Sequence, residues 1–184
     1  MKEVRGVYGG NFSDSDVHDF CDYLYNNHGY FKYVYVYQSS SPDALKYATL
    51  DDILYWSGHG WSTGHLSYGL TEGQKEVEES NKFYGPEYVG INWVTQGKTT
   101  NSYWNSDLEW VIFAACDQMK EPARTKWAKT MLGTQHQVHG ICGYEGTGPG
   151  DIVDNAIVEK FMAYLNAGYS FCFCWEMANE TNGK

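Results

Sequence analysis

The stretch ILYWSGHG, residues 53–60, decides the fold of this chain, because an apolar run ends there in a turn-forming sequence. Ile53–Trp56 shows no alternation of polar and apolar residues, which is typical of a strand buried on both faces of a parallel sheet. WVIFA, Trp110–Ala114, has the same character. We therefore predict that both segments are strands of a mostly parallel central sheet.

Segments on either side of these runs alternate between strand and helix patterns. Aromatic and β-branched residues predict further strands at Val4–Tyr8, Phe31–Tyr37 and Val138–Cys142. Apolar residues at helical spacing predict helices that begin at Ser13–Asp16 and that cover Pro122–Leu132 and Ile152–Asn166. The tail FCFCWEMAN fits either period, and a helix opened by Ser170 is favoured. Strands that alternate with helices predict an α/β sandwich.

The length of 184 residues fits one domain, residues 1–184. Between the two buried strands, residues from about 61 to 107 are dense in Gly, Ser, Asn, Thr and aromatic side chains, with short strand-like runs such as Tyr88–Val94. A structureless loop of this length is uncommon inside a domain. We therefore expect an insertion of loops or hairpins in this segment.

Composition excludes several classes of partner. With 13 basic and 23 acidic residues the net charge is −10, which disfavours nucleic acid or an anionic membrane as a partner. The sequence has no apolar run long enough to cross a bilayer. Five cysteines without a CxxC motif suggest neither a disulfide framework nor a zinc ribbon, so a cytoplasmic location is expected, with secretion from a longer precursor left open.

Two predicted strand ends carry reactive side chains. Ligands of open α/β sheets bind at the carboxyl ends of strands, where His59 and Cys116 follow their strands. If the strands are neighbours, a cysteine nucleophile and a histidine acid/base share one edge of the sheet. Nearby amide groups favour the thiolate, and the N–H groups of Gly60 and Cys116 are candidates for an oxyanion hole. Either residue alone is more often structural.

The sequences SGHG (57–60) and AAC (114–116), each after an apolar strand, resemble the caspase–gingipain–legumain clan of cysteine peptidases. VHGICGYEG (138–146) and the helix that follows are similar to the strand, specificity loop and helix after the nucleophile in bacterial members. DLEWVIFAAC (107–116) looks closest to an uncharacterised bacterial group of the clan. The resemblance extends over residues 50–180, and residues 1–49 share only the order of elements.

The resemblance implies a caspase-like three-layer α/β/α sandwich and an endopeptidase without cofactor or metal, acting on a peptide or protein substrate. It assigns Cys116 as the nucleophile and His59 as the general acid/base. The residues after the nucleophile, Asp117-Gln118, match no signature of the clan. Caspases bind an aspartate side chain with arginines, whereas this chain has only Arg5, at the opposite end of its strand, and Arg124. Aspartate specificity is therefore not expected.

An acidic pocket for Lys or Arg is the alternative specificity, since several carboxylates lie in or beside the predicted rim loops. The candidates are Asp117, Glu145, Asp151 and Asp154. For Asp151 and Asp154, taken singly, the role of a helix N-cap is favoured over a role in the pocket. Gly146–Gly150 is expected to form the pocket wall by close approach of its backbone. Four aromatic residues are candidates either for the substrate groove or for the core: Trp61, Trp93, Tyr103 and Trp104.

Other functions remain open from the sequence. His59 with His65, and His136 with His139 and Cys142, suggest a metal site, but the HxxHxxC spacing of the second cluster is not a recognised zinc spacing. The same thioester could be attacked by an amine, which would make the protein a peptide ligase or cyclase. A peptide-binding pseudoenzyme that keeps the groove without turnover is a third alternative. The oligomeric state is not indicated.

Overall fold

The computed structural model describes residues 1–10, 14–36, 41–69, 83–86, 104, 107–132 and 138–182. Its centre is a five-stranded sheet in the order β2-β1-β3-β6-β7, in which every pair of neighbours is parallel. The strands are β1 (Glu3–Tyr8), β2 (Phe31–Val36), β3 (Ile53–Ser57), β6 (Trp110–Ala114) and β7 (Gly140–Gly143). The prediction of a mostly parallel α/β sheet is confirmed.

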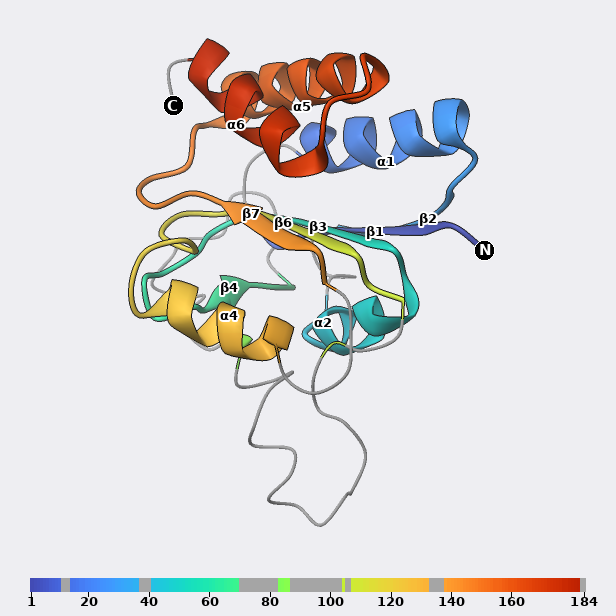
Figure 1. Cartoon of the computed structure of the whole chain (residues 1–184). Coiled ribbons are helices and arrows are strands. Elements are labelled where there is room, and N and C mark those ends of the chain that lie inside the picture. Colours follow the sequence, from blue (N-terminus) through green and yellow to red (C-terminus); the bar gives the residue numbers. More distant parts are fainter. Residues whose placement is uncertain are drawn as a thin grey trace.

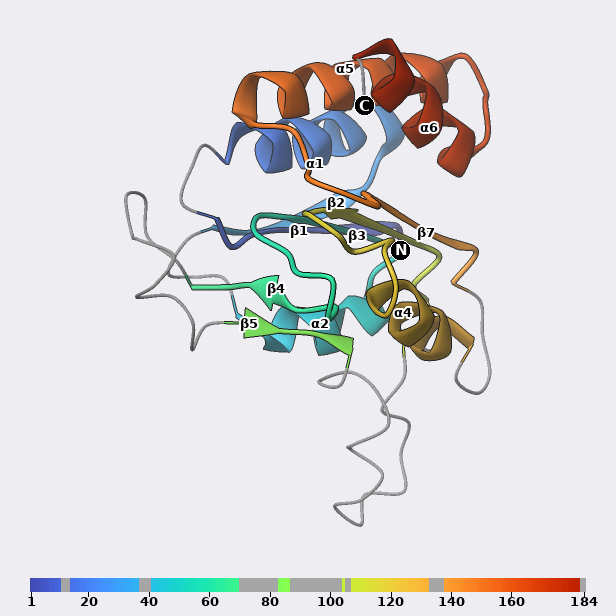
Figure 2. The ribbon, with the colours of Figure 1, turned by 90° about the vertical axis from the view of Figure 1, so that its left-hand side faces the viewer.

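Helices cover both faces of this sheet (Figures 1 and 2). One face carries α1 (Ser15–His28), α5 (Asp151–Asn166) and α6 (Phe171–Thr181). The other carries α2 (Asp43–Tyr47) and α4 (Ala123–Leu132), together with a two-stranded antiparallel sheet of β4 (Leu66–Ser67) and β5 (Phe83–Tyr84). A short 3-10 helix, η2 (Ala48–Leu50), follows α2. The arrangement is a three-layer α/β/α sandwich.

The register of β3 on β6 determines where His59 and Cys116, the candidate catalytic residues, leave the sheet. All five residues of β3 are buried, and the strand pairs with β6 from Ile53 opposite Trp110 to Ser57 opposite Ala114. Because the two strands are parallel and end at the same level, the chain segments that follow them leave the sheet side by side. His59 and Cys116 therefore emerge at one edge.

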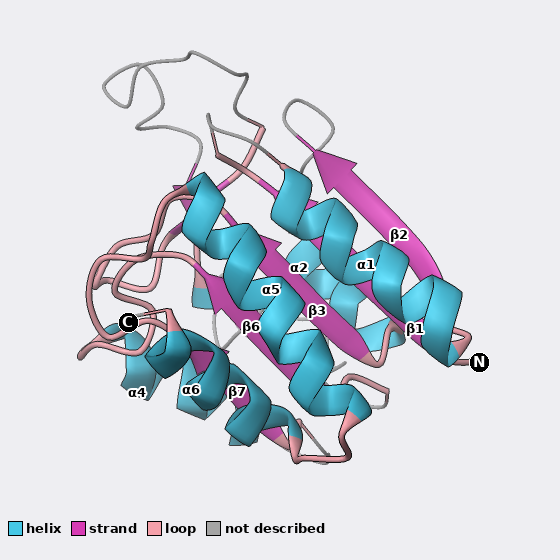
Figure 3. Cartoon of the chain, turned by 90° about the horizontal axis from the view of Figure 1, so that it is seen from above, coloured by secondary structure: helices cyan, strands magenta, loops and turns pink. Residues whose placement is uncertain are grey.

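Amphipathic helices close the face above the sheet (Figure 3). The apolar residues at helical spacing in α1, Val17, Phe20, Cys21 and Leu24, are buried, and Gly29 ends the helix in the left-handed conformation at φ 70°. The ambiguous tail is a helix, α6, which confirms the favoured interpretation. Its buried residues recur at helical spacing: Phe171, Cys174, Trp175, Ala178 and Asn179. Phe171 stacks on Trp110 of β6 at a centroid separation of 4.7 Å.

Two elements differ from the sequence-based predictions. Strand β7 begins at Gly140 rather than Val138, because its first partner is Trp110, the first residue of β6, so no neighbouring strand extends further back. Helix α2 was not predicted, since its five residues are too few to show a helical period. The strand-like run Tyr88–Val94 lies outside the described residues.

The layer below the sheet contains a large aromatic core. Trp104 stacks on Trp127 of α4 with ring centroids 5.4 Å apart and planes 2° apart. The indole N–H of Trp104 donates to the carbonyl oxygen of Leu45 over 2.6 Å. Trp104 is thus a core residue, and the groove interpretation is wrong for it. Trp93 and Tyr103 lie outside the described residues.

Arg5 forms a buried ion pair with Asp51, which precedes β3. The pair lies toward the amino ends of the strands, away from His59 and Cys116, as predicted for Arg5. None of the helices in the described part of the chain is long and apolar enough to span a membrane.

Candidate active site

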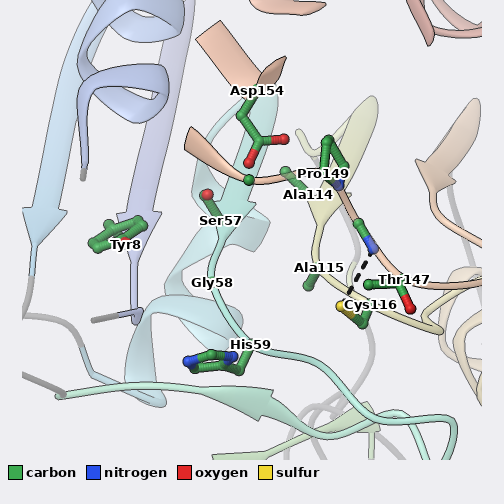
Figure 4. A pocket seen from close by; sticks show the side chains of 12 residues that line it. Tyr8, Ser57, Gly58, His59, Ala114, Ala115, Cys116, Thr147, Pro149 and Asp154 are labelled. Carbon is green, nitrogen blue, oxygen red and sulfur yellow. Dashed lines mark hydrogen bonds between the residues drawn. The ribbon is translucent and has the colours of Figure 1, made fainter. Parts of the chain in front are cut away.

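A pocket of about 470 Å³ opens at the carboxyl ends of the central strands (Figure 4). Tyr8, Ser57 and Ala114, the last residues of three adjacent strands, line it. His59 and Cys116 lie beyond two of these strand ends and also line the pocket. The loop 147–150 and the first turn of α5 complete its wall. The pocket therefore lies at the edge of the sheet where the sequence predicts His59 and Cys116.

The main chain of His59 is held by Ser67 of β4. The amide N–H of His59 donates to Ser67 Oγ over 2.9 Å, and the carbonyl oxygen of His59 accepts from the amide of Ser67 over 3.0 Å. Gly58 precedes it at φ 144°, a conformation that L side chains rarely adopt. The conformation of Gly58 and the two hydrogen bonds to Ser67 thus fix the course of the main chain at His59.

Gly60 brings this segment into direct contact with the segment of Cys116. A Cβ built on Gly60 would lie 2.5 Å from the carbonyl oxygen of Cys116 and 3.0 Å from Cβ of Ala115. Gly60 also forms an antiparallel bridge with Leu66. The hydrogen bonds of this bridge are made by the flanking residues: the amide of Trp61 donates to His65, and His59 accepts from the amide of Ser67. In such a bridge the N–H and C=O of the central residue point away from the partner strand. The polar groups of Gly60 are thus directed away from β4.

The chain turns sharply directly after Cys116. Asp117 has φ 58°, an uncommon value for a residue with a side chain, and its amide donates to the carbonyl oxygen of Gly146 over 2.9 Å. A residue held in this region costs of order 1 kcal/mol or more, and such positions concentrate at functional sites. The bond to Gly146 ties the turn to the loop on the opposite wall of the pocket.

The thiol of Cys116 has a hydrogen-bond donor in that loop. The amide N–H of Gly148 donates to Cys116 Sγ over 3.2 Å, drawn as the dashed line in Figure 4. A backbone donor directed at sulfur stabilises the thiolate more than the thiol. The glycine-rich loop, expected to form a pocket wall, therefore also contacts the sulfur atom of Cys116.

Gln118 is a fully buried amide behind Cys116 that sequence reasoning missed. Its Nε2 lies 3.1 Å from each of three carbonyl oxygens, those of Trp61, His65 and Cys116. Its Oε1 accepts from the indole N–H of Trp127 over 2.8 Å. The side chain thus fastens the segment after β3 to the turn after β6. Nothing in the sequence near Gln118 indicates this role, because its partners lie in other segments of the chain.

The side chains of His59 and Cys116 do not point at one another. In Figure 4 the imidazole ring extends from its strand end away from Cys116. The ring lies 6.1 Å, between centroids, from the indole of Trp61, which is half-buried. Trp61, a candidate for substrate binding, therefore lies beside His59, while His65 is engaged at Nδ1 by Thr63 Oγ1 over 2.7 Å.

Asp154 gives the pocket its charge. Its carboxylate points from α5 toward the strand ends, and among the described lining residues it is the one carboxylate, with no lysine or arginine (Figure 4). Burial and, secondarily, the charges of Asp154 and Asp16 raise the pKa of Tyr144. Burial and the same two carboxylates also raise the pKa of Tyr55, whose hydroxyl donates to Asp16 over 2.9 Å. The interior behind this wall is therefore electronegative.

Two of the other acidic residues that were candidates for substrate binding do not line the pocket. Asp117 pairs with Lys120 at 3.5 Å, and Glu145 is exposed in the turn after β7; neither lines the pocket. Asp151 is the first residue of α5. Of the suggested metal clusters, His136 lies outside the described residues, and within the described ranges no three His, Cys, Asp or Glu side chains are grouped as a metal ion would require.

Comparison with known proteins assigns the chain to a family. The family described as Domain of unknown function (DUF6345) matches residues 13–184, so the chain belongs to it. No curated protein matches the sequence.

Proposed function

We propose that the protein is a cysteine endopeptidase with Cys116 as its nucleophile. The observation that supports it best is the donation from Gly148 N–H to Cys116 Sγ, 3.2 Å, at the edge where two adjacent parallel strands end. A half-buried thiol with a backbone donor, in a pocket at a strand-end edge, fits a reactive thiolate better than a structural cysteine.

In the proposed reaction the Cys116 thiolate attacks the carbonyl carbon of the scissile peptide bond. The C–N bond then breaks, the leaving amine takes a proton from the His59 imidazolium, and an acyl thioester remains. Water attacks the thioester with His59 as base, the C–S bond breaks, and the product leaves as a carboxylic acid that loses its proton to solvent, which restores the Cys116 thiolate and the His59 imidazolium.

His59 must turn toward the sulfur in this mechanism. Its main chain is fixed by Ser67, so rotation about its side-chain bonds is the movement required. Hydrogen bonds of catalytic groups are often formed only when substrate is bound, which is compatible with the outward ring. We assign oxyanion stabilisation to the amide groups of Gly60 and Cys116. Gly60 is suited to it because its backbone lies against the turn at Cys116 and its N–H is directed away from β4.

Asp154 supports cleavage after basic residues. A Lys or Arg side chain in the pocket would gain a charge-assisted hydrogen bond to this carboxylate, and the pocket has no cation of its own among its described lining residues to compete. The electronegative interior behind Tyr144 acts in the same direction. Asp117, Glu145 and Asp151 are not needed for this preference.

We further propose that the three-layer sandwich is a caspase-like fold. The support is the order of elements, with the histidine after β3 and the cysteine after β6, and the resemblance of SGHG and AAC to the caspase–gingipain–legumain clan. A solved structure of this chain, superposed on members of the clan, would test the assignment.

Incubation with a diverse peptide mixture, followed by mass spectrometry of the products, tests the activity. Wild type should cleave, and Cys116→Ala and His59→Ala should lose at least about 1,000-fold in rate, since removal of one member of a catalytic unit costs about that much or more. Cys172→Ala and His139→Ala, which change exposed residues outside the pocket, are matched controls and should cleave normally. Cleavage that survives Cys116→Ala would overturn the proposal, and joined peptides would indicate a ligase.

The specificity is tested with paired substrates that differ only at the residue before the cleaved bond. Arg against its neutral isostere citrulline removes the charge with little change of shape. We expect wild type to prefer Arg and Asp154→Asn to lose most of that preference, while Glu159→Gln, on the exposed side of α5, retains it. Equal preference in wild type and Asp154→Asn would contradict the assignment of Asp154 but not of Cys116.

A further inference from the structure

A second pair of reactive groups lies outside the pocket, where α6 meets β7. Cys142 is the third residue of β7 and Cys172 the second residue of α6. Their sulfur atoms are 3.3 Å apart although the residues are 30 positions apart in sequence. Both are thiols in this structure.

The surrounding residues hold the two sulfurs together. A Cβ built on Gly140 would lie 2.9 Å from Cys172 Sγ, so the absence of a side chain there leaves room for the thiol against β7. Gly140 and Cys142 are two residues apart on one strand and so face the same side of the sheet. The start of α6 is anchored by the stacking of Phe171 on Trp110, which fixes the position of Cys172.

The two thiols differ in access and in acidity. Cys172 is exposed, whereas Cys142 is buried. A hydrogen bond from the Cys142 thiol lowers the pKa of Cys172 to about 7. The same hydrogen bond, together with burial, raises the pKa of Cys142. The exposed sulfur is thus the one that is more readily ionised, and the buried sulfur is placed to react second.

Two further cysteines are poor competitors for this chemistry. Cys21 and Cys174 are both buried, and burial raises the pKa of each thiol. Cys116 is the remaining thiol with access to solvent, and it lies in the pocket.

We propose that Cys142 and Cys172 are a redox-active pair that hydrogen peroxide oxidises to a reversible disulfide, with Cys172 as the thiol that reacts first. The Cys172 thiolate attacks one oxygen of the peroxide, the O–O bond breaks, and the departing hydroxide takes a proton, which gives a sulfenic acid and one water. The sulfur of Cys142 attacks the sulfenic sulfur, the S–O bond breaks, and the hydroxide leaves as a second water with the thiol proton of Cys142. Two thiols lose two electrons in total, and one peroxide is reduced.

The full chain, first reduced and freed of reductant, is treated with one equivalent of hydrogen peroxide, blocked with N-ethylmaleimide and mapped by non-reducing peptide mass spectrometry. We expect a crosslinked peptide pair containing Cys142 and Cys172, a loss of about 2 Da, and reversal by dithiothreitol. Cys116→Ala is the control and should form the same crosslink. Because this variant lacks the proposed nucleophile, a crosslink in it shows that the redox pair does not depend on the proposed peptidase activity.

Two variants assign the order of reaction. Cys142→Ser should leave Cys172 as a sulfenic acid that dimedone traps, because the second sulfur is missing. Cys172→Ser, a change at an exposed position, should abolish the crosslink and leave Cys142 reduced. The proposal is overturned if wild-type Cys172 accumulates as sulfenic or sulfinic acid without forming the crosslink to Cys142, or if the crosslink in wild type joins other cysteines. The wild-type measurement decides this point even if a variant folds poorly.

Discussion

The amide N–H of Gly148 donates to the sulfur of Cys116 over 3.2 Å, and this contact joins the loop after β7 to the turn after β6. The same loop is fixed a second time, where the amide of Asp117 donates to Gly146. A hydrogen bond from an N–H group stabilises a thiolate more strongly than it stabilises a neutral thiol. The loop is therefore expected to control the reactivity of Cys116 as well as the shape of the pocket.

Replacement of Gly148 by proline removes that N–H and should slow the alkylation of Cys116 by iodoacetamide at neutral pH by about tenfold or more, since hydrogen bonds to charged groups contribute ~1.5–3 kcal/mol. Gly148→Ala keeps the donor, and its Cβ would meet the ring of Tyr144 at 3.0 Å, a contact that a small ring movement relieves. Site-resolved mass spectrometry of the alkylated thiol measures both. Equal slowing in the two variants would mean that the alkylation rate of Cys116 depends on the conformation of the loop and not on the Gly148 N–H.

Gly60→Ala should distort the pocket. Its Cβ would lie 2.5 Å from the carbonyl oxygen of Cys116, a backbone atom that cannot move aside by a rotamer change. We expect a loss of about 1–3 kcal/mol in unfolding free energy, as for overpacked sites, and a lower turnover. Denaturant titration and the peptide assay measure the two effects.

Gly146→Ala is the matched control for this substitution. A Cβ at Gly146 meets nothing within 4 Å, although the residue belongs to the same rim. Its stability should stay within about 0.5 kcal/mol of wild type. If Gly60→Ala were equally neutral, the close approach of the two segments would not exist in solution.

Much of the fold could be predicted because its strongest patterns are unambiguous. Ile53–Trp56 and Trp110–Ala114 are uninterrupted apolar runs, and burial on two faces in a parallel sheet is what such runs require. Weak or short patterns gave errors. The run from Val138 carries strand-forming residues, but pairing begins only where β6 begins, and this tertiary limit is invisible in a local window.

The candidate site could be predicted only where a residue's role follows from its place in the topology. His59 and Cys116 each follow a buried strand, so the strand-end rule locates them together. Gln118 was missed because its partners come from segments 57 and 53 residues away in sequence, joined only by the fold. The outward direction of the His59 ring likewise depends on side-chain packing rather than on spacing.

Gln118→Glu tests whether the buried amide holds the two segments together. The change keeps the shape but replaces the Nε2 donor, which lies near three carbonyl oxygens, with an acceptor. Unsatisfied buried polar groups cost ~1–3 kcal/mol each, so we expect a loss of about 3 kcal/mol or more in unfolding free energy. Denaturant unfolding measures it, with Glu121→Gln, a change at an exposed side chain, as the control. A loss below about 1 kcal/mol would show that water or a rearrangement replaces the donor.

The reactivity of Cys172 should depend on pH in a way that reports its contact with Cys142. The thiolate is the reactive form, so a pKa of about 7 for Cys172 predicts an alkylation rate that rises with pH and is half-maximal near that value. In Cys142→Ala the hydrogen-bond donor is absent, and the midpoint should rise toward the ordinary thiol value of about 8.5. The thiol of Cys172 is partly desolvated although the residue is exposed, and this opposes the lowering of its pKa. Cys174 is a further titratable thiol near the pair, and it acts on Cys142. Site-resolved alkylation between about pH 5 and about pH 9 measures both midpoints in a Cys116→Ala background. An identical midpoint with and without Cys142 would rule out the hydrogen bond between the two sulfurs as the cause.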